Sequence, residues 1–472
     1  MISAFSLRIP KPLLVLIIPL NLVLIFGIIV YVAEIPTDEY VDRDMISSGF
    51  RQLTQKFDFG YLNQNVSDVD LQNVDTYSTY GFKIKPNNVK FKFVNPKKKI
   101  GTPEDILKKN KETFEEVMAQ EIHEPKDADL QSMRPPSKKD IDKYKHANAT
   151  IIALVRNNEA SAITKTIRRF ETRFNSKFRY PYTFINDEPF TERFMQRMQK
   201  LSDAPMEFVT IPSELWKKPS DIDTEREEKA MQLLSDQRIS YAKKGSYHNM
   251  CRFYSGNFYN VPELKKYQYY WRIEPNVFFY NDLEYDVFKY MEVTKKAYGF
   301  AINLYDISET VVSLWPETLK FLNKGDNYKY VNPNGAFQWL LENQQNPKNN
   351  KKANGYSTCH FWSNFEIGDM DFYRGEAYNE WFKYLDSTGN FYYERWGDAP
   401  VHSMGLALFA DTKDIHWFRD IGYYHDPYVN CPNSPDTIGC EAGQFSRWDH
   451  LADQNCMASW IDYSMEDPSA IY

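Results

Sequence analysis

The sequence predicts an α/β fold with a mixed, largely parallel central sheet. Two observations support this. Short apolar, β-branched runs alternate with stretches of helical periodicity, and the runs end in polar residues, as buried strands do where they enter loops. The predicted strands are residues 150–155, 182–186, 208–211, 269–273 and 298–304.

The first strand and helix carry the clearest pattern. Residues 150–155 are apolar and end in Arg156-Asn157-Asn158, and Pro181 closes the connection to the strand at 182–186. In parallel sheets ligands bind beyond the carboxyl ends of the strands, so chemistry is expected after residues 155, 186 and 273. The intervening helix is predicted from apolar side chains at helical spacing, namely Ile163, Ile167, Phe170 and Phe174.

A membrane anchor is predicted near the start of the chain. The 22 residues from Pro12 to Ala33 carry no charge, which suffices to cross a hydrocarbon core of about 30 Å. The alternative is a cleaved signal peptide, whose apolar core is usually shorter. Arg8 and Lys11 precede the span and acidic residues follow it, so residues 1–11 are expected in the cytosol and the rest in the lumen.

Between the anchor and the sheet, residues 34–145 are polar and punctuated by prolines and charge runs. They predict a stem that separates the membrane from a catalytic domain at 146–472. An extra folded subdomain is the alternative, because Phe91 and Phe93 indicate some packing. The sequons at Asn65 and Asn148 agree with a secretory-pathway location.

Charge and cysteine content narrow the function classes. The balance of 57 basic and 64 acidic residues gives a net charge of −7, so nucleic acid is not an expected partner. The five cysteines show no C-x₂-C spacing typical of a metal site. An oxidising lumen then favours disulfides plus one free thiol, with the pairing left open.

A candidate metal ligand follows the aromatic strand at 269–273. Glu274 lies where that strand emerges into a loop, and a carboxylate there can hold a hard divalent cation that bridges the diphosphate of a nucleotide-sugar. The alternative is an ordinary solvated turn residue.

A second candidate is Glu366, which lies within the aromatic stretch 359–369. Aromatic rings suit the apolar faces of a sugar, and a neighbouring carboxylate can attack or stabilise an oxocarbenium-like centre. The alternative is a core helix in which Glu366 is capped or paired. Downstream, 393–402 and 421–425 add a charged loop and histidines, which are more often structural.

Several of these stretches together resemble the fungal α-1,2-mannosyltransferases of glycosyltransferase family 15. The resemblance runs in order from about residue 148 to 460. The segments that carry it are 186–190 (NDEPF), 270–275 (YWRIEP), 360–369 (HFWSNFEIGD), 393–402 (YERWGDAPVH) and 422–425 (GYYH).

The resemblance implies a GT-A-like nucleotide-sugar transferase fold, GDP-mannose as donor, Mn²⁺ as cofactor and retention of the α configuration. Glu274 would bind the metal and the donor, with His425 as second metal ligand. Tyr247 would lie against the donor, and Arg156 would reach the nucleotide. One departure stands at Asn276, where the family usually has Asp.

For the reaction itself, the resemblance makes Glu366 the nucleophile or the stabiliser of the positive charge. Arg272, Trp362 and Asp398 would line the acceptor mannose. Loss of a carboxylate at Asn276 would tune donor binding, or alter activity if the family's Asp orients a ligand.

The expected protein is therefore a single-pass type II enzyme of the Golgi membrane. It would transfer mannose from GDP-mannose to α-mannosides on mannosylated glycoproteins, N- or O-linked, through α-1,2 linkages. The alternatives are a mannosylphosphate transferase of the same family and, because of Asn276, a weakly active scaffold or mannan-binding protein.

Overall fold

The computed structural model describes residues 102–123, 128–342 and 345–465. The predicted cytosolic tail, the anchor at 12–33 and the stem up to residue 101 lie outside the described residues. Among the helices that are described, none combines the length and the apolar character needed to cross a membrane.

A seven-stranded sheet forms the centre, in the order β10-β6-β9-β4-β1-β2-β3. β9 runs antiparallel to both of its neighbours, and all other neighbouring strands are parallel. This confirms the mixed, largely parallel sheet. Its strands are β1 (Ala149–Leu154), β2 (Tyr182–Asn186), β3 (Met206–Thr210), β4 (Tyr269–Arg272), β6 (Tyr298–Phe300), β9 (Glu366–Asp369) and β10 (Ile415–Trp417).

The strand predicted at 298–304 was wrong in its extent. The chain leaves the central sheet after β6, and Asn303–Tyr305 form β7, which pairs with β8 (Cys359–Phe361) in a separate two-stranded sheet. Both halves of the run are buried, so its apolar pattern does not reveal the change of sheet. The helix considered for 359–369 is also wrong, since this stretch forms β8 and β9.

A third sheet includes β5, the strand that follows β4 along the chain. β11 (Tyr423–His425) runs antiparallel to both β5 (Phe278–Phe279) and β12 (Tyr428–Asn430). Because β5 follows the Glu274 turn by only a few residues, this sheet brings His425 close to Glu274.

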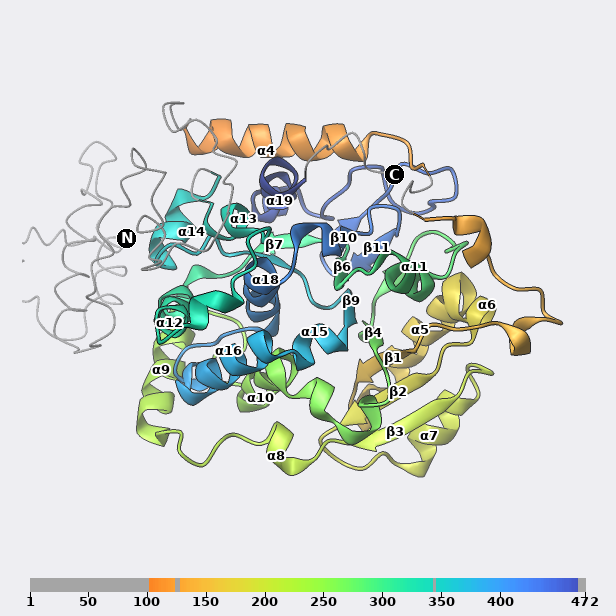
Figure 1. Cartoon of the computed structure of the whole chain (residues 1–472), viewed down its shortest axis with the longest axis horizontal. Helices are drawn as coiled ribbons and strands as arrows, with labels where there is room; N and C mark the ends of the chain where they lie inside the picture. Colours follow the sequence, from red (N-terminus) through yellow and green to blue (C-terminus); the bar gives the residue numbers. More distant parts are fainter. Residues whose placement is uncertain (1–101, 124–127, 343–344, 466–472) are drawn as a thin grey trace, which may run out of the picture. The chain divides into compact units, whose positions relative to one another are not determined.

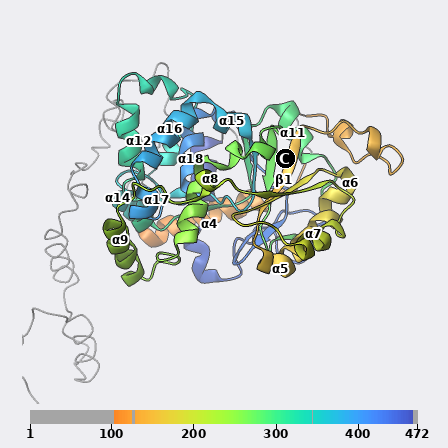
Figure 2. The ribbon, with the colours of Figure 1, turned by 90° about the horizontal axis from the view of Figure 1, so that it is seen from below.

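Two groups of helices lie apart from each other in Figures 1 and 2: α5, α6 and α7 lie with β1, and α9, α12, α16 and α18 lie together away from them. The helices are α4 (Pro103–Met118), α5 (Ala160–Phe170), α6 (Ser176–Phe178), α7 (Glu192–Gln199), α8 (Ser213–Trp216), α9 (Thr224–Asp236), α10 (Gly245–Gly256), α11 (Val287–Thr294), α12 (Leu314–Leu322), α13 (Phe337–Leu341), α14 (Pro347–Lys352), α15 (Met370–Arg374), α16 (Glu376–Ser387), α17 (Asn390–Tyr393), α18 (Asp398–Phe409) and α19 (Met457–Ser464).

Two helices position the site. The predicted helix after β1 is α5, extended by a π-helical turn to Asn175, and its apolar face is buried as expected. α18 is buried from Asp398 to Leu408, as a helix that is apolar on all sides must be. It packs against α10 and β8, so polar side chains on α18 face the protein interior.

Part of the predicted stem packs into this fold. α4 lies alongside α19 in Figure 1, and Phe114 and Val117 of α4 belong to the same hydrophobic core as the central sheet. The buried guanidinium of Arg419 donates to the carbonyl oxygens of Val117 and Gln120, at 2.9 and 2.8 Å. The packed domain therefore includes residues before 146, and a stem over 34–101 stays a prediction.

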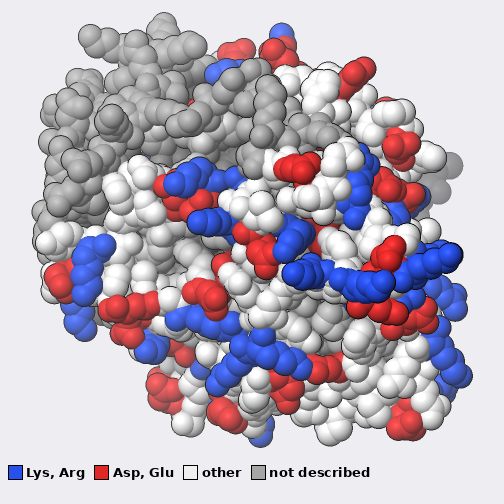
Figure 3. Space-filling view, turned by 45° about the vertical axis from the view of Figure 1, so that its right-hand side comes forward, with Lys and Arg blue, Asp and Glu red and all other residues white. Residues whose placement is uncertain are grey.

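The cysteines form two disulfides, Cys359–Cys456 and Cys431–Cys440, and Cys251 is a buried free thiol. This confirms disulfides plus one free cysteine. Basic and acidic side chains are interspersed on the face of the protein seen in Figure 3.

Candidate active site

The register between β4 and β9 brings two candidate residues together. Arg272, the last residue of β4, is paired across the antiparallel ladder with Glu366, the first residue of β9. Directly opposed residues on neighbouring strands lie within reach of each other. Arg272 is 3% exposed and Glu366 is fully buried, so both charges must be compensated inside the protein.

Arg272 is the centre of a buried charge cluster. Its Nη2 lies 2.5 Å from Glu274 Oε1, and its Nη1 lies 2.6 Å from Asp398 Oδ2 and 3.7 Å from Glu366 Oε1. The guanidinium also stacks 3.7 Å above the ring of Tyr254. A planar fork of donors suits several carboxylates at once. Because one guanidinium faces three carboxylates, the cluster has a net negative charge.

Glu274 and His425 form the exposed edge of this cluster. Glu274 Oε2 lies 3.6 Å from His425 Nε2, and both side chains are 27% exposed. α5 fixes the turn, because the Thr166 hydroxyl donates to the Glu274 carbonyl oxygen at 3.0 Å. Burial alone would raise the pKa of Glu274, but attraction to Arg272, aided by His425, lowers it to about 2.

These two side chains fit a divalent cation such as Mn²⁺. A carboxylate oxygen and an imidazole nitrogen suit such an ion, and the negative balance of the cluster favours positive charge there. Within the described ranges, no group of three or more His, Cys, Asp or Glu side chains is arranged to hold a metal. Glu274 and His425 would therefore provide two ligands and leave the remaining positions to oxygen atoms of phosphates or water.

The departure at Asn276 has a backbone explanation. Asn276 is exposed and adopts a left-handed conformation with φ of 66°. Asn and Asp are the side chains most tolerant of that region after glycine. The turn thus accepts either residue, and the Glu274 carboxylate is held in place by Arg272 rather than by position 276.

Glu366 is held asymmetrically. Its Oε2 accepts a hydrogen bond from the Tyr298 hydroxyl at 3.0 Å and lies 3.0 Å from Nδ1 of His402. Its Oε1 is buried and has no hydrogen-bond partner among the described residues, and Nη1 of Arg272 lies 3.7 Å from it. One oxygen is therefore fixed by two donors, and the other is left for electrostatic interactions.

The predicted acceptor residues separate into two kinds. Trp362 is partly exposed, and its ring meets those of His425 and Tyr428 edge to face at 5.0 Å. Asp398 is buried, where it accepts hydrogen bonds from Arg272 and from the Ser363 hydroxyl at 2.8 Å. Trp362 is available to a sugar, whereas Arg272 and Asp398 are engaged with each other.

The predicted donor residues lie around this cluster. The Tyr247 hydroxyl, on α10, accepts a hydrogen bond from Nη1 of Arg395 at 3.1 Å, and its ring stacks on that of Tyr241 at 4.7 Å. Arg156 is exposed just beyond β1, at the same edge of the sheet as Glu274, because β1 and β4 are parallel.

Sequence reasoning missed the residues that hold Glu366 and Arg272 in place. His402 and Tyr298 bind Glu366, and the Tyr254 ring lies beneath Arg272. His402 lies one helical turn after Asp398 on α18, so a shared helix face was the available signal. Nothing in the local pattern around Tyr254 or Tyr298 indicates their partners.

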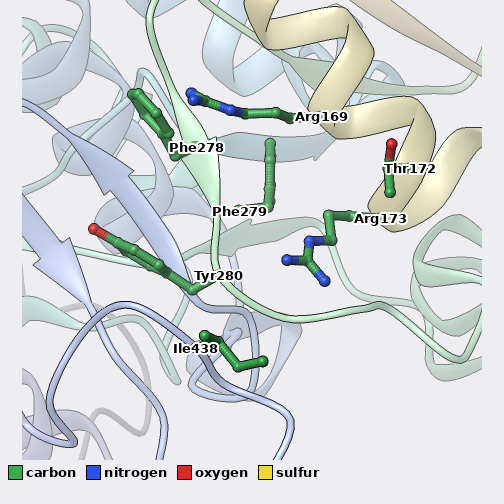
Figure 4. A pocket seen from close by; sticks show the side chains of 7 residues that line it. All are labelled: Arg169, Thr172, Arg173, Phe278, Phe279, Tyr280 and Ile438. Atoms are coloured by element: carbon green, nitrogen blue, oxygen red, sulfur yellow. The ribbon is translucent and has the colours of Figure 1, made fainter.

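A cavity of about 320 Å³ lies beside this centre rather than in it. In Figure 4 the side chains of Arg169 and Phe278 converge, and the Arg169 guanidinium stacks 3.5 Å above the Phe278 ring. None of the predicted site residues lines the cavity. Its lining is Arg169, Thr172, Arg173, Phe278, Phe279, Tyr280 and Ile438.

Comparison with known proteins agrees over most of the chain. Residues 104–465 match the family described as glycolipid 2-alpha-mannosyltransferase. The probable mannosyltransferase KTR4 of Saccharomyces cerevisiae is 48% identical over 373 residues, covering 77% of this chain and 78% of that protein.

Two solved structures are similar. The mannosyltransferase Ktr4p from S. cerevisiae in complex with GDP has a TM-score of 0.76 and 45% identity, covering 85% of this chain and all of that one. Core-mannan synthase A from Aspergillus fumigatus, in its Mn/GDP form, has a TM-score of 0.71 and 46% identity, covering 74% and 93%.

Proposed function

Since this chain belongs to the glycolipid 2-alpha-mannosyltransferase family, the fungal mannosyltransferases of glycosyltransferase family 15, we propose that it transfers mannose from GDP-mannose to α-mannosides of glycoprotein glycans. The linkage formed is α-1,2, with retention at the anomeric carbon. The observation that carries the proposal is the buried cluster of Arg272 with Glu274, Glu366 and Asp398, which opens to solvent at His425.

The donor binds at the exposed edge of the cluster, in a GT-A-like manner. Glu274 and His425 hold Mn²⁺, which when bound neutralises the diphosphate of GDP-mannose and makes GDP a better leaving group. Two similar structures support a GDP-linked donor, because both contain GDP, and the one described as a Mn/GDP form suggests Mn²⁺ as the ion. Tyr247 and Arg156 contact the donor from α10 and from the end of β1.

Glu366 provides negative charge for the reacting sugar. Its carboxylate is fully buried beneath Arg272, so direct attack on the anomeric carbon would require Arg272 to move away. Stabilising positive charge as the glycosidic bond to GDP breaks requires no such movement. The arrangement therefore favours Glu366 as the stabiliser over Glu366 as the nucleophile.

Trp362 supplies the platform for the acceptor. Its partly exposed ring stands beside His425, and the face of an indole suits the apolar face of a mannose ring. Asp398 and Arg272 then shape this side of the site through their mutual hydrogen bond, and the acceptor hydroxyl enters from the same side as the departing diphosphate.

We further propose that the protein is a type II protein of the Golgi membrane, anchored through residues 12–33 with the catalytic domain in the lumen. The charge asymmetry around this segment supports the orientation. The two disulfides support an oxidising compartment. Protease treatment of sealed Golgi vesicles should spare the catalytic domain, and its digestion from outside would contradict the topology.

The product distinguishes this function from its alternatives. The purified protein with GDP-mannose, Mn²⁺ and an α-mannoside should yield a product heavier by one mannose, sensitive to an α-1,2-specific mannosidase. An increase by mannose phosphate would instead identify a mannosylphosphate transferase. Metal-dependent binding of GDP without any product would favour a scaffold or mannan-binding protein.

A further inference from the structure

His402 has no role in the mechanism given so far, although it is fully buried beside Glu366. It lies on α18, and both of its ring nitrogens face oxygen atoms. Nδ1 lies 3.0 Å from Glu366 Oε2, and Nε2 lies 2.8 Å from the carbonyl oxygen of Tyr254. A carbonyl oxygen only accepts hydrogen bonds, so Nε2 must carry a proton.

The contact between Nδ1 of His402 and Oε2 of Glu366 depends on which of the two groups carries a proton. The Tyr298 hydroxyl also donates to Oε2, so Oε2 acts as an acceptor. A proton on Oε1 would be a buried donor without a partner, because Oε1 makes no hydrogen bond to the described residues. A proton on Oε2 would instead be donated to Nδ1 and would make both partners neutral. The guanidinium of Arg272, 3.7 Å from Oε1, favours the ionised form of Glu366 over this neutral pair. Nδ1 of His402 then carries a proton as well, which makes the ring an imidazolium.

The surrounding charges agree with this state. Burial alone would lower the pKa of His402, but Glu366, together with Asp398 and the Tyr254 carbonyl, raises it above its usual value.

The remaining groups around the ring come from other helices and from β4. Tyr373 and Phe258 pack against it, with ring centroids at 4.9 and 6.1 Å, and Tyr378 lies at 6.4 Å. None of these carries charge at neutral pH. Arg272 contacts the opposite oxygen of Glu366, so His402 and Arg272 flank the carboxylate from two sides.

We propose that His402, as an imidazolium, is the positioning residue that keeps Glu366 ionised and turns its Oε1 toward Arg272. Tyr298 assists by occupying the same Oε2. This rests on the proposed function, because Glu366 is the group whose charge the transfer reaction uses. His402 itself touches neither donor nor acceptor, and acts through Glu366.

The kinetic test compares His402→Asn with His402→Phe. Asn retains a neutral donor near Nδ1 but removes the charge, whereas Phe removes both. We expect kcat to fall about ten-fold or more in the first and further in the second, with KM for GDP-mannose within about two-fold of wild type. The wild-type kcat should also decline at alkaline pH as His402 loses its proton, and His402→Asn should lack this decline.

The matched control is His416→Asn, because His416 is another buried histidine, on the edge strand β10. It should alter thermal stability without altering kcat or its pH dependence. A His402→Asn variant with wild-type kcat and an unaltered alkaline decline would overturn the proposal, whatever its melting temperature.

A readout without turnover separates this proposal from the proposed function. In ¹⁵N-histidine-labelled protein, the His402 ring should show two protonated nitrogens at about pH 7, and in Glu366→Gln it should become neutral. A neutral His402 ring in wild type would overturn the proposal even if mannose transfer is confirmed. A doubly protonated ring in a protein that fails to transfer mannose would refute the proposed function alone.

Discussion

The Glu274 carboxylate is expected to stabilise the fold as well as to bind metal. Its pKa falls from 4.5 to about 2, mainly because Arg272 lies 2.5 Å away in a site that would otherwise disfavour the charge. At about 1.4 kcal/mol per pH unit, this corresponds to about 3 kcal/mol of stability at neutral pH. Glu274→Gln should lose most of it, while Arg272 keeps Asp398 as a partner.

The difference in unfolding free energy between wild type and Glu274→Gln should shrink as the pH falls. A carboxylate whose folded-state pKa is depressed stabilises fully above its unfolded pKa and loses that effect as pH falls through the folded value. The gap in unfolding free energy between wild type and Glu274→Gln should therefore be about 3 kcal/mol near pH 7 and about 1.4 kcal/mol near pH 3.

Urea unfolding at several pH values, in the absence of added metal, measures this gap. Glu380→Gln is the control, because Glu380 forms a surface pair with Lys383 and its side chain is 47% exposed, where such pairs contribute less than about 1 kcal/mol. Equal stability of wild type and Glu274→Gln at neutral pH, or a gap independent of pH, would refute the assigned contact with Arg272.

Three further predictions concern other parts of the chain. Replacing both cysteines of the Cys359–Cys456 disulfide by serine should lower the unfolding free energy by about 4.7 kcal/mol, and the same change at Cys431–Cys440 by about 2.6 kcal/mol. The first loss is larger because that disulfide closes a chain segment of 97 residues and the second one of 9. Equal losses in calorimetry would contradict this. Asn276→Asp should leave the melting temperature within about 1 °C, since both residues suit the left-handed turn, and a large loss would show that the turn selects Asn. Trp362→Ala should raise KM for the acceptor about ten-fold or more while GDP affinity, measured by calorimetry, stays unchanged; an unchanged acceptor KM would remove Trp362 from the acceptor site.

The local sequence pattern predicted a strand correctly where the whole segment lies in a single sheet. β2 has the bounds predicted for it, because Pro181 and a polar loop delimit a fully buried run. The run at 298–304 failed for the opposite reason: β6 and β7 are both buried but belong to different sheets. The direction of β9 depends on pairing with β4, nearly a hundred residues earlier, which no local pattern encodes.

In the site, too, some features follow from the local sequence and others only from tertiary packing. Glu274 was indicated by its place after an aromatic strand, but the pairing with His425 across 150 residues came only from family resemblance, and the structure brings the two side chains within 3.6 Å. His402 stood in a segment already singled out, yet its contact with Glu366 depends on how α18 packs against the sheet. Individual candidates follow from chemistry and spacing, whereas their partners follow from tertiary packing.

The charge of Glu366 is the most direct test of the proposed site. Glu366→Gln preserves size and most hydrogen-bonding atoms, so single-turnover transfer should slow by about 10²-fold or more while GDP affinity stays near wild type. Melting temperature on the same preparation separates this from a purely structural role. A folded variant that binds GDP and transfers mannose at the wild-type rate would contradict the assignment of Glu366 to the reaction.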